Sequence, residues 1–305
     1  MITKSLNKIS KAIKNPYIVL AKLIEGRARF ISDKKYLEIF YRASFGTSFN
    51  WDNPITYNQK LQWLKIHDRN PVYKKLVDKY EVRKIVSSLI GEQYLIPILG
   101  AWDAFDDIDF DKLPSQFVLK CTHDSGGVVI CKDKTKFNVA ATRYKINKHM
   151  KQDFFWYKRE WPYKDIKPKI IAEKFMEDES YKELKDFKLF MFYGEPKMLF
   201  VASDRNKSGE NVKFDYFDIN FTKLILRQTA HENSNYKIEK PRNFDDMIEI
   251  AKTLSKGIPH VRIDLYNING SIYFGEYTFF HHSGLVPFIP AEYDALLGKL
   301  LPLDK

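Results

Sequence analysis

A single lysine inside an apolar run, followed by a glycine turn, constrains the fold of this chain more than any other feature. Glycine lets a backbone approach an anion closely, and the free N–H groups of such a turn are neutral donors. The two apolar halves predict a β-hairpin with the outline of a phosphate-binding loop. An ordinary hairpin whose lysine reaches solvent fits the same pattern. The run reads Phe117-Val118-Leu119-Lys120-Cys121-Thr122-His123-Asp124-Ser125-Gly126-Gly127-Val128-Val129-Ile130.

Length and composition indicate a globular protein with a substantial core. The chain has 305 residues, of which 44% are hydrophobic and 29% charged, and this length predicts two domains or subdomains. The formal net charge of +11 favours anionic partners, although a solvated lysine-rich surface gives the same balance. We expect no nucleic-acid partner, because zinc-finger, RRM-type and arginine-rich patterns are absent from the sequence.

The sequence predicts a cytoplasmic protein with reduced thiols. No run of about 18 apolar residues indicates a membrane-spanning helix, and lysines interrupt any signal-peptide core in the opening segment. The only two cysteines, Cys121 and Cys131, are too few for a disulfide framework or a zinc site. Residues 1–40 form a basic, amphipathic segment interrupted at Pro16. We expect it either to pack on its own domain or to contact the inner face of the cytoplasmic membrane peripherally.

Periodicity predicts helices that alternate with strands. Thr56 and Gln59 have the spacing of a capping box and begin a helix over 57–67. A second helix over 73–89 ends at Gly91, and further helices are expected around 137–155 and over 244–255. Strands are expected over 94–99, 169–176, 187–193 and 197–202. This alternation indicates an α/β or α+β protein.

A second hairpin brings acidic residues together. Asn269-Gly270 joins two runs of alternating character, 261–266 and 272–278. A two-residue turn would place Asp264 and Glu276 on opposite faces, whereas a three-residue loop, 268–270, places them on one face. We favour the three-residue loop, which sets Asp264 opposite Phe274 and Glu276 opposite Arg262.

This register collects oxygen ligands on one sheet face. Asp264 and Glu276 would share that face with Arg262 and Thr278. Two carboxylates and a hydroxyl suit Mg²⁺, a hard cation that bridges phosphates. A surface acidic pair neutralised by Arg262 is the other interpretation.

Taken together, these segments resemble the ATP-grasp fold, and closely the TupA-like ATP-grasp family of bacterial polysaccharide gene clusters. The resemblance covers roughly residues 41–290, and the order and spacing of the segments make it specific. The residues that carry it are Asn53-Pro54, Gln59-Lys60-Leu61-Gln62-Trp63-Leu64-Lys65, Asp78-Lys79-Tyr80-Glu81-Val82-Arg83, Leu95-Ile96-Pro97, Phe117-Val118-Leu119-Lys120, Ser125-Gly126-Gly127, Lys167-Pro168-Lys169, Asp186-Phe187-Lys188, Gly194-Glu195-Pro196, Arg262-Ile263-Asp264-Leu265-Tyr266 and Phe274-Gly275-Glu276.

The resemblance implies an α+β architecture in which two α+β subdomains clasp ATP. Residues 79–305 would form the ATP-grasp domain, with a first subdomain over 79–173 and a second over 174–305. The basic segment 1–40 and a helical region over 41–78 would precede it.

The resemblance also implies roles for individual residues, with ATP and Mg²⁺ as the cofactors. Lys79 and Lys120 would hold the phosphates under a loop of Ser125, Gly126 and Gly127. The adenine contacts would come from Glu173, Lys174 and Met176. The metal ligands would be Asp264, Glu276 and Thr278, the last standing where many relatives have asparagine. The γ-phosphate or acyl phosphate would contact Lys188, Arg205 and Arg262.

The implied activity is an ATP-dependent carboxylate–amine ligase that acts through an acyl phosphate. The anionic substrate would be an acidic sugar or a cell-surface polysaccharide precursor, and an amino acid or other amine would be the co-substrate. A glycosyltransferase is the main alternative, because Asp107-Ile108-Asp109 and Asp109-Phe110-Asp111 satisfy a DxD metal pattern. An ATP-dependent phosphotransferase on the same fold and a non-catalytic glycan-binding module are further alternatives. His281 and His282 follow the acidic strand and are candidates for substrate contact.

Overall fold

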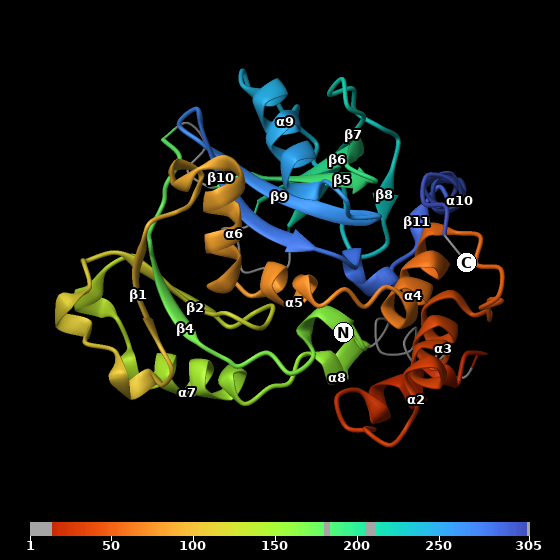
Figure 1. The fold of residues 1–305 in the computed structure, drawn as a ribbon, viewed down its shortest axis with the longest axis horizontal. Coiled ribbons are helices and arrows are strands. Elements are labelled where there is room, and N and C mark those ends of the chain that lie inside the picture. Colours follow the sequence, from red (N-terminus) through yellow and green to blue (C-terminus); the bar gives the residue numbers. More distant parts are fainter. Residues whose placement is uncertain (1–13, 180–183, 205–211, 304–305) are drawn as a thin grey trace.

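Two antiparallel sheets organise the chain and lie on either side of its centre (Figure 1). The structure is a computed structural model that describes residues 14–179, 184–204 and 212–303. The smaller sheet has the order β1 (Ile98–Trp102), β4 (Ile170–Lys174), β2 (Phe117–Cys121), β3 (Val128–Cys131). The larger sheet has the order β10 (Ser271–Thr278), β9 (His260–Ile268), β5 (Asp186–Phe192), β6 (Glu195–Ser203), β7 (Lys213–Phe217). A two-stranded ribbon pairs β11 (Phe288–Ile289) with β8 (Arg227–Gln228).

Helices surround these sheets. The α-helices described are α2 (Tyr17–Ile24), α3 (Asp33–Phe45), α4 (Tyr57–His67), α5 (Val72–Val77), α6 (Glu81–Ile90), α7 (Val139–Met150), α8 (Phe155–Lys158), α9 (Phe244–Ser255) and α10 (Glu292–Lys299). The short 3₁₀ helices are η1 (Glu92–Tyr94), η2 (Phe105–Asp107), η3 (Phe110–Lys112), η4 (Lys134–Lys136), η5 (Trp161–Tyr163) and η6 (His281–Gly284). Within the described ranges, no helix is long and apolar enough to cross a membrane.

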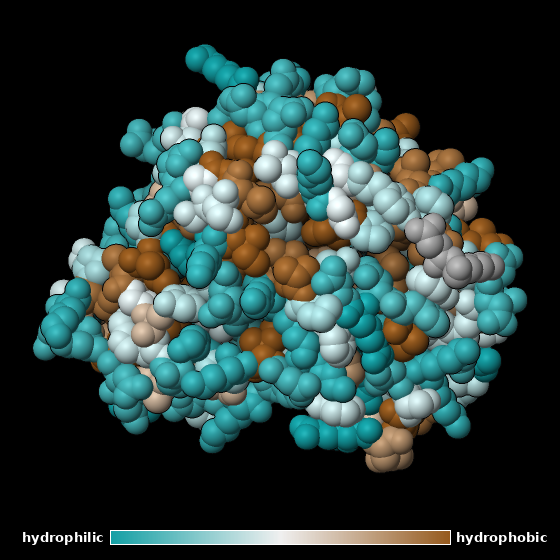
Figure 2. Space-filling view, viewed as in Figure 1, coloured by the Kyte–Doolittle hydropathy of each residue, from teal (hydrophilic) through white to brown (hydrophobic). Residues whose placement is uncertain are grey.

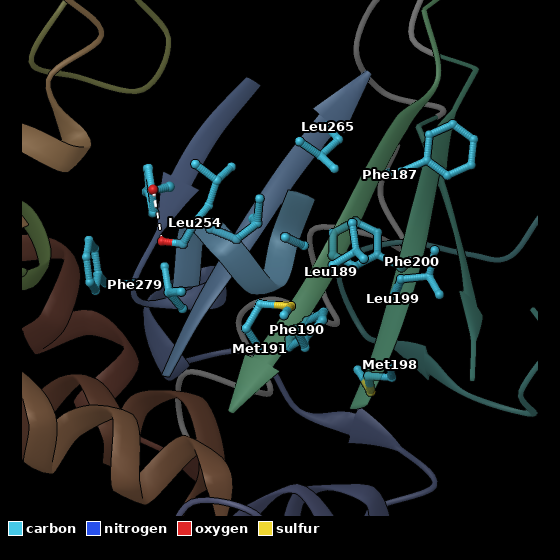
Figure 3. Packing of buried hydrophobic residues seen from close by; sticks show 14 of the residues in the cluster. Phe187, Leu189, Phe190, Met191, Met198, Leu199, Phe200, Leu254, Leu265 and Phe279 are labelled. Atoms are coloured by element: carbon cyan, nitrogen blue, oxygen red, sulfur yellow. Dashed lines mark hydrogen bonds between the residues drawn. The ribbon is translucent and has the colours of Figure 1, made fainter. Parts of the chain in front are cut away.

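The larger sheet carries the main hydrophobic core. Helix α9 packs against β5, β6 and β9, and Figure 3 shows the apolar side chains that fill this contact. The Tyr277 hydroxyl donates to the carbonyl of Leu254 at 3.0 Å, which ties β10 to the end of α9. Val82 and Val86 of α6 belong to the same buried cluster. A separate cluster, which includes Phe117, lies on one face of the smaller sheet.

Several predicted elements are confirmed. Helix α4 has the predicted bounds, and its capping box is present because the Thr56 hydroxyl accepts from the Gln59 N–H while the Gln59 side chain accepts from the Thr56 N–H. Helix α9 also has the predicted bounds. Cys121 and Cys131 lie on strands β2 and β3, buried and unpaired, as expected.

The helix predicted over 73–89 is wrong, because the chain breaks into α5 and α6 at residues 78–80. Asp78 is extended, and its Oδ1 accepts from the backbone N–H groups of Tyr80 and Glu81 at 2.8 and 2.9 Å. The Lys79 N–H donates to the carbonyl of Thr122 at 3.0 Å. The break therefore joins the helical region to the smaller sheet at Lys79.

The strand predicted over 94–99 is also displaced along the chain. Residues 92–94 form η1, and β1 begins only at Ile98. Pro97 has no N–H to donate to a neighbouring strand, which disfavours a strand centred on it. Its carbonyl accepts from the Lys174 N–H at 2.9 Å and so meets the end of β4.

Candidate functional site

A cavity of about 450 Å³ lies between the facing surfaces of the two sheets. Val118 and Lys120 line it from β2 of the smaller sheet, on the face opposite the buried Phe117 and Leu119. Lys188 and Asp264 line it from the larger sheet. The two sheets thus supply cationic and anionic groups to one cavity.

Three chemically important residues form a row across the larger sheet. Asp264 of β9 is paired directly with Lys188 of β5 on one side and with Glu276 of β10 on the other. Lys188 donates to an oxygen of Asp264 and lies 3.0 Å from an oxygen of Asp186. Because cross-strand partners share a face, all three row residues point toward the cavity.

The register of this hairpin corrects the predicted one. Ser271 pairs with Ile268, so the turn is the two-residue Asn269-Gly270 and not the three-residue loop. Asp264 and Glu276 still share a face, because a bulge at Gly275 shifts the register between Phe274 and Glu276. Glu276 is therefore opposite Asp264 and not opposite Arg262, which pairs with Thr278 instead.

Gly275 makes this bulge sterically feasible. A Cβ at this position would lie 3.0 Å from the carbonyl oxygen of Asp264 and 3.3 Å from the ring of Tyr266. Bulges re-aim the side chains that follow them. The absent side chain of Gly275 thus allows Glu276 to reach the row.

Arg262 connects the acidic residues to one another. Its Nε and Nη2 donate to the two oxygens of Asp264 at 2.6 and 2.7 Å. Nη2 also lies 3.2 Å from Glu276 Oε1 and 2.9 Å from the Thr278 hydroxyl, which itself donates to Glu276 at 2.8 Å. Nη1 donates to Nδ1 of His281 at 2.8 Å. The guanidinium is therefore held from several directions.

His281 is neutral in this arrangement. Burial lowers its pKa well below the usual range, and the neighbouring charge of Arg262 acts in the same direction. With Nδ1 accepting from Arg262, Nε2 donates to Gln228 Oε1 at 2.6 Å, and Gln228 also accepts from the Tyr216 hydroxyl at 2.7 Å. The buried hydrogen-bonded series of Tyr216, Gln228 and His281 therefore fixes the orientation of the Arg262 guanidinium.

Glu276 remains ionised throughout the physiological range. Burial opposes ionisation, but the charges of Lys188, Arg262 and Lys79 prevail and lower the pKa of Glu276 to about 2. The Glu276 side chain is 47% exposed, whereas that of Asp264 is 1% exposed. Glu276 is thus the more accessible carboxylate of the row.

The smaller sheet contributes a second charged group. Lys120 of β2 forms an ion pair of 2.5 Å with Glu173 of β4, and Arg83 of α6 lies 3.6 Å from the same carboxylate. Both strands present these side chains on the cavity face. Glu173 therefore holds Lys120 while one further cation approaches from α6.

Lys79 lies beside the glycine loop. Its ammonium donates to the carbonyl of Asp124. Burial lowers the pKa of Lys79, and the negative charges of Glu276 and Asp124 oppose that effect. The break between α5 and α6 thus brings Lys79 to the loop and to the acidic row.

The glycine loop is anchored at its base. Asp124 is buried, contacts His149 of α7 and accepts from the N–H of Gly127 at 3.3 Å. A Cβ on Gly127 would lie 2.8 Å from the Cys121 side chain, so glycine alone fits there. Ser125 and Gly126 line the cavity, whereas Gly127 closes the turn beneath it.

The remaining sequence-predicted residues divide into three groups. Lys174, the last residue of β4, and Met176 line the cavity beside Phe175 and Glu177, so the end of β4 and the segment after it are accessible from the cavity. Glu173 lines it too, with its carboxylate committed to Lys120. Arg205 lies outside the described residues.

The DxD patterns are not part of the site. Asp107 and Asp109 lie in and beside the short helices η2 and η3, and neither lines the cavity. Asp109 forms an exposed ion pair with Lys112 at 3.2 Å. The Asp111 N–H donates to Oδ1 of Asp109 at 3.1 Å.

Four residues of the site were not identified from the sequence. The sequence predicted no role for Arg83, Asp186 or His149. It predicted His281 only as a possible contact for the substrate. Asp186 and Arg83 lie within segments that carry the family resemblance, which was the one available signal for them. The contacts of His149 and His281 depend on tertiary packing that no local pattern encodes.

The two carboxylates of the row and the Thr278 hydroxyl beside them have donor chemistry that fits Mg²⁺. Asp264, Glu276 and Thr278 offer oxygen atoms alone, which is the preference of this ion. Mg²⁺ is commonly bound through one or two carboxylates together with substrate phosphates, so a complete protein cage is not needed. Accordingly, the described part of the chain holds no cluster of three or more histidine, cysteine, aspartate or glutamate residues able to bind a metal by themselves.

Comparison with solved structures returned proteins of low sequence identity. The D-alanine–D-alanine ligase of Bacillus anthracis complexed with ATP is 16% identical, covers 74% of this chain and has a TM-score of 0.40. The L-amino acid ligase of Bacillus licheniformis is 13% identical, covers 90% of this chain and has a TM-score of 0.48. The chain spans 62% and 64% of the lengths of these two proteins.

Comparison with protein families was decisive. No curated protein matched the chain significantly. The family model described as TupA-like ATPgrasp matches residues 59–302, well over half of the chain, and takes in both sheets and the whole cavity between them. The chain belongs to the TupA-like ATP-grasp family and has the ATP-grasp fold.

Proposed function

We propose that this protein binds ATP in the cavity and uses it to join a carboxylate to an amine. The observation that carries this proposal is the row Lys188–Asp264–Glu276 on one sheet, with Lys79 and Lys120 at the same cavity. Enzymes catalyse phosphoryl transfer mainly by positioning the reacting groups and by neutralising the charge on the transferred phosphoryl group. The lysines on two sides of this cavity would supply both.

The cations would divide the nucleotide between them. Lys79 and Lys120 would bind its phosphates under the loop of Ser125 and Gly126, whose backbone can approach closely. Lys174 and Met176 would contact the adenine through their backbone. Glu173 would hold Lys120 in place, as it does in the structure.

Asp264 and Glu276 are the residues that would hold Mg²⁺, with Thr278 as a further oxygen donor. When bound, Mg²⁺ would neutralise charge on the nucleotide phosphates. Glu276 is suited to this role because its pKa of about 2 keeps it ionised and its side chain is open to the cavity.

The proposed reaction has two steps. An oxygen of the substrate carboxylate attacks the γ-phosphorus of ATP, the bond between that phosphorus and ADP breaks, and an acyl phosphate forms. The nitrogen of the amine then attacks the acyl carbon, the bond to phosphate breaks and an amide forms, with the amine proton passing to solvent. Lys188 and Arg262 would stabilise the negative charge that develops on the transferred group.

We further propose that the carboxylate belongs to an acidic sugar or a cell-surface polysaccharide precursor, and that an amino acid is the preferred amine. Membership of the TupA-like family supports this choice. The net charge of +11 is consistent with an anionic substrate.

The test is release of ADP and phosphate from ATP with Mg²⁺, measured across uronic acids, nucleotide-linked uronates and amino acids. We expect release to require both a carboxylate and an amine. Lys120→Ala should abolish it, and Lys136→Ala, a change of an exposed lysine outside the cavity, should not. Transfer to a carboxylate without any amine would identify a phosphotransferase. Turnover of a nucleotide sugar without ATP would replace the proposal with a glycosyltransferase.

A further inference from the structure

Helix α2 packs on its domain through a small part of its surface. Ala21 is buried in the cluster that joins α2 to α3, and Tyr17 and Ile24 pack partly against it. Three other apolar side chains of the helix, those of Val19, Leu20 and Leu23, are exposed. The apolar side of a helix is normally buried against its own domain, so this exposure calls for an explanation.

The outward side chains form a protruding apolar surface. Leu23 is 62% exposed, and Val19 and Leu20 lie at helical spacings that place them on the same side. Phe30, in the turn after α2, is 89% exposed. Figure 2 shows hydrophobic side chains among hydrophilic ones at the lower edge of the molecule, below α2 in Figure 1. We call these four residues, Val19, Leu20, Leu23 and Phe30, the α2 surface.

Cationic side chains flank the α2 surface, and the acidic residues near it already form ion pairs with other cations. Lys22, Arg27 and Arg29 lie along the same segment with exposed side chains. The only acidic residues over 17–35 are Glu25 and Asp33. Glu25 pairs with Lys158 at 2.6 Å, and Asp33 pairs with Arg159 and Arg69 at 3.0 and 3.1 Å. The charge around the α2 surface is therefore strongly positive.

We propose that the α2 surface docks the protein on a bilayer that contains anionic phospholipid. Apolar side chains that protrude between lysines and arginines have the composition of interfacial membrane anchors. The anionic head groups of the lipids would attract the lysine and arginine side chains, and Leu23 and Phe30 would insert at the boundary of the acyl chains.

Charge argues against the two other occupants of this surface. Residues 1–13 carry three lysines and no acid, so folding them over the α2 surface would bring like charges together. A second copy of the chain would present the same cations to this one. An anionic bilayer is complementary to both the surface and the segment that precedes it.

The test uses the full chain and sedimentation with vesicles of phosphatidylcholine alone or with phosphatidylserine. Wild type should bind the mixed vesicles, and binding should weaken with added salt. The variant Leu23→Ser/Phe30→Ser should lower the partition coefficient about ten-fold. Lys22→Glu/Arg27→Glu should lower it by at least about five-fold for each cation lost.

Matched controls exist elsewhere on the molecule. Ile225 is as exposed as Phe30, so Ile225→Ser removes one fully exposed apolar side chain outside the α2 surface. Lys256→Glu/Lys299→Glu reverses two exposed lysines far along the chain. Both controls should bind like wild type, and all variants should melt at the same temperature because every changed side chain is exposed.

Three outcomes would overturn the proposal. The first is failure of the wild type to sediment with phosphatidylserine vesicles. The second is an equal loss of binding in the Ile225 control. The third is a dimer in sedimentation velocity that the Leu23/Phe30 variant abolishes while vesicle binding is absent, which would assign the surface to a second copy. ATP turnover is not part of the readout, so this proposal and the proposed ligase activity stand or fall separately.

Discussion

Arg262 binds both carboxylate oxygens of Asp264, its neighbour two residues along strand β9. Both side chains are buried, and the same guanidinium also reaches Glu276 and His281. Buried charges are stable only when they are paired and hydrogen-bonded. This pair therefore holds Asp264, the central residue of the acidic row, in the orientation that the structure shows.

Replacing Arg262 should expose that dependence. Arg262→Leu leaves the buried Asp264 with Lys188 as its remaining cation, and removing one partner of a buried pair costs about 3–5 kcal/mol. Arg262→Lys keeps the charge but loses the two-pronged geometry, so its loss should be intermediate. Urea denaturation of the three proteins measures the free energy of unfolding. Equal stability of wild type and the leucine variant would contradict the inferred role.

Replacing Gly275 by alanine should lower ATP turnover more than it lowers the stability of the fold. In Gly275→Ala the new Cβ would press on the backbone of Asp264, and overpacking of this kind costs about 1–3 kcal/mol. Relief requires the bulge to shift, which moves Glu276 out of the row. We expect ATP turnover to fall by a larger factor than stability alone explains. Ser271→Ala, at an exposed position on the same strand, is the control, and matching behaviour of the two variants would refute the role of the bulge.

The hairpin also shows how far sequence patterns reach. Residue types alone predicted that Asp264 and Glu276 meet on one sheet face, and the structure agrees. The predicted three-residue loop was wrong, because the turn has two residues. A bulge at Gly275 is what returns Glu276 to the same face as Asp264. A bulge depends on pairing with a partner strand, and the alternation of one strand does not reveal it.

Local signals and tertiary contacts explain the other outcomes. Helix α4 was predicted correctly because its capping box lies within four neighbouring residues. The break before α6 was missed, since Lys79 donates its N–H to Thr122 of a distant loop. The charged site residues could be selected by type and family resemblance. Their pairings, such as Arg262 with His281, could not.

The break at Asp78 gives a third prediction. Asp78→Ala removes the acceptor for the N–H groups of Tyr80 and Glu81, and loss of such a cap costs about 1 kcal/mol. Lys79 would lose its fixed approach to the loop, so affinity for ATP should fall as well. Asp78→Asn keeps the acceptor oxygen and should retain most of both properties. Calorimetric titration with ATP and urea denaturation measure them, and identical alanine and asparagine variants would rule out the capping explanation.

His260 should make the fold sensitive to acid. It is buried, accepts from the Tyr57 hydroxyl at 2.8 Å and donates to the carbonyl of Met191 at 2.9 Å, so it is neutral. Burial lowers its pKa to about 3, whereas an unfolded histidine titrates near about 6.5. Between these values the unfolded chain binds one more proton than the folded protein. Stability contributed by this group is therefore complete above about pH 6.5 and declines as pH falls toward 3.

The slope of that decline is the measurable quantity. One proton corresponds to about 1.4 kcal/mol per pH unit between about pH 6 and pH 4. His260→Gln cannot take up this proton, so its free energy of unfolding should be lower at pH 8 but should fall less steeply on acidification. His281 and His282, whose pKa values burial also lowers, keep part of the slope in both proteins. Urea denaturation of wild type and His260→Gln at a series of pH values checks this. If the free energies of unfolding of wild type and His260→Gln change in parallel with pH, unfolding does not change the protonation of His260, and the prediction is wrong.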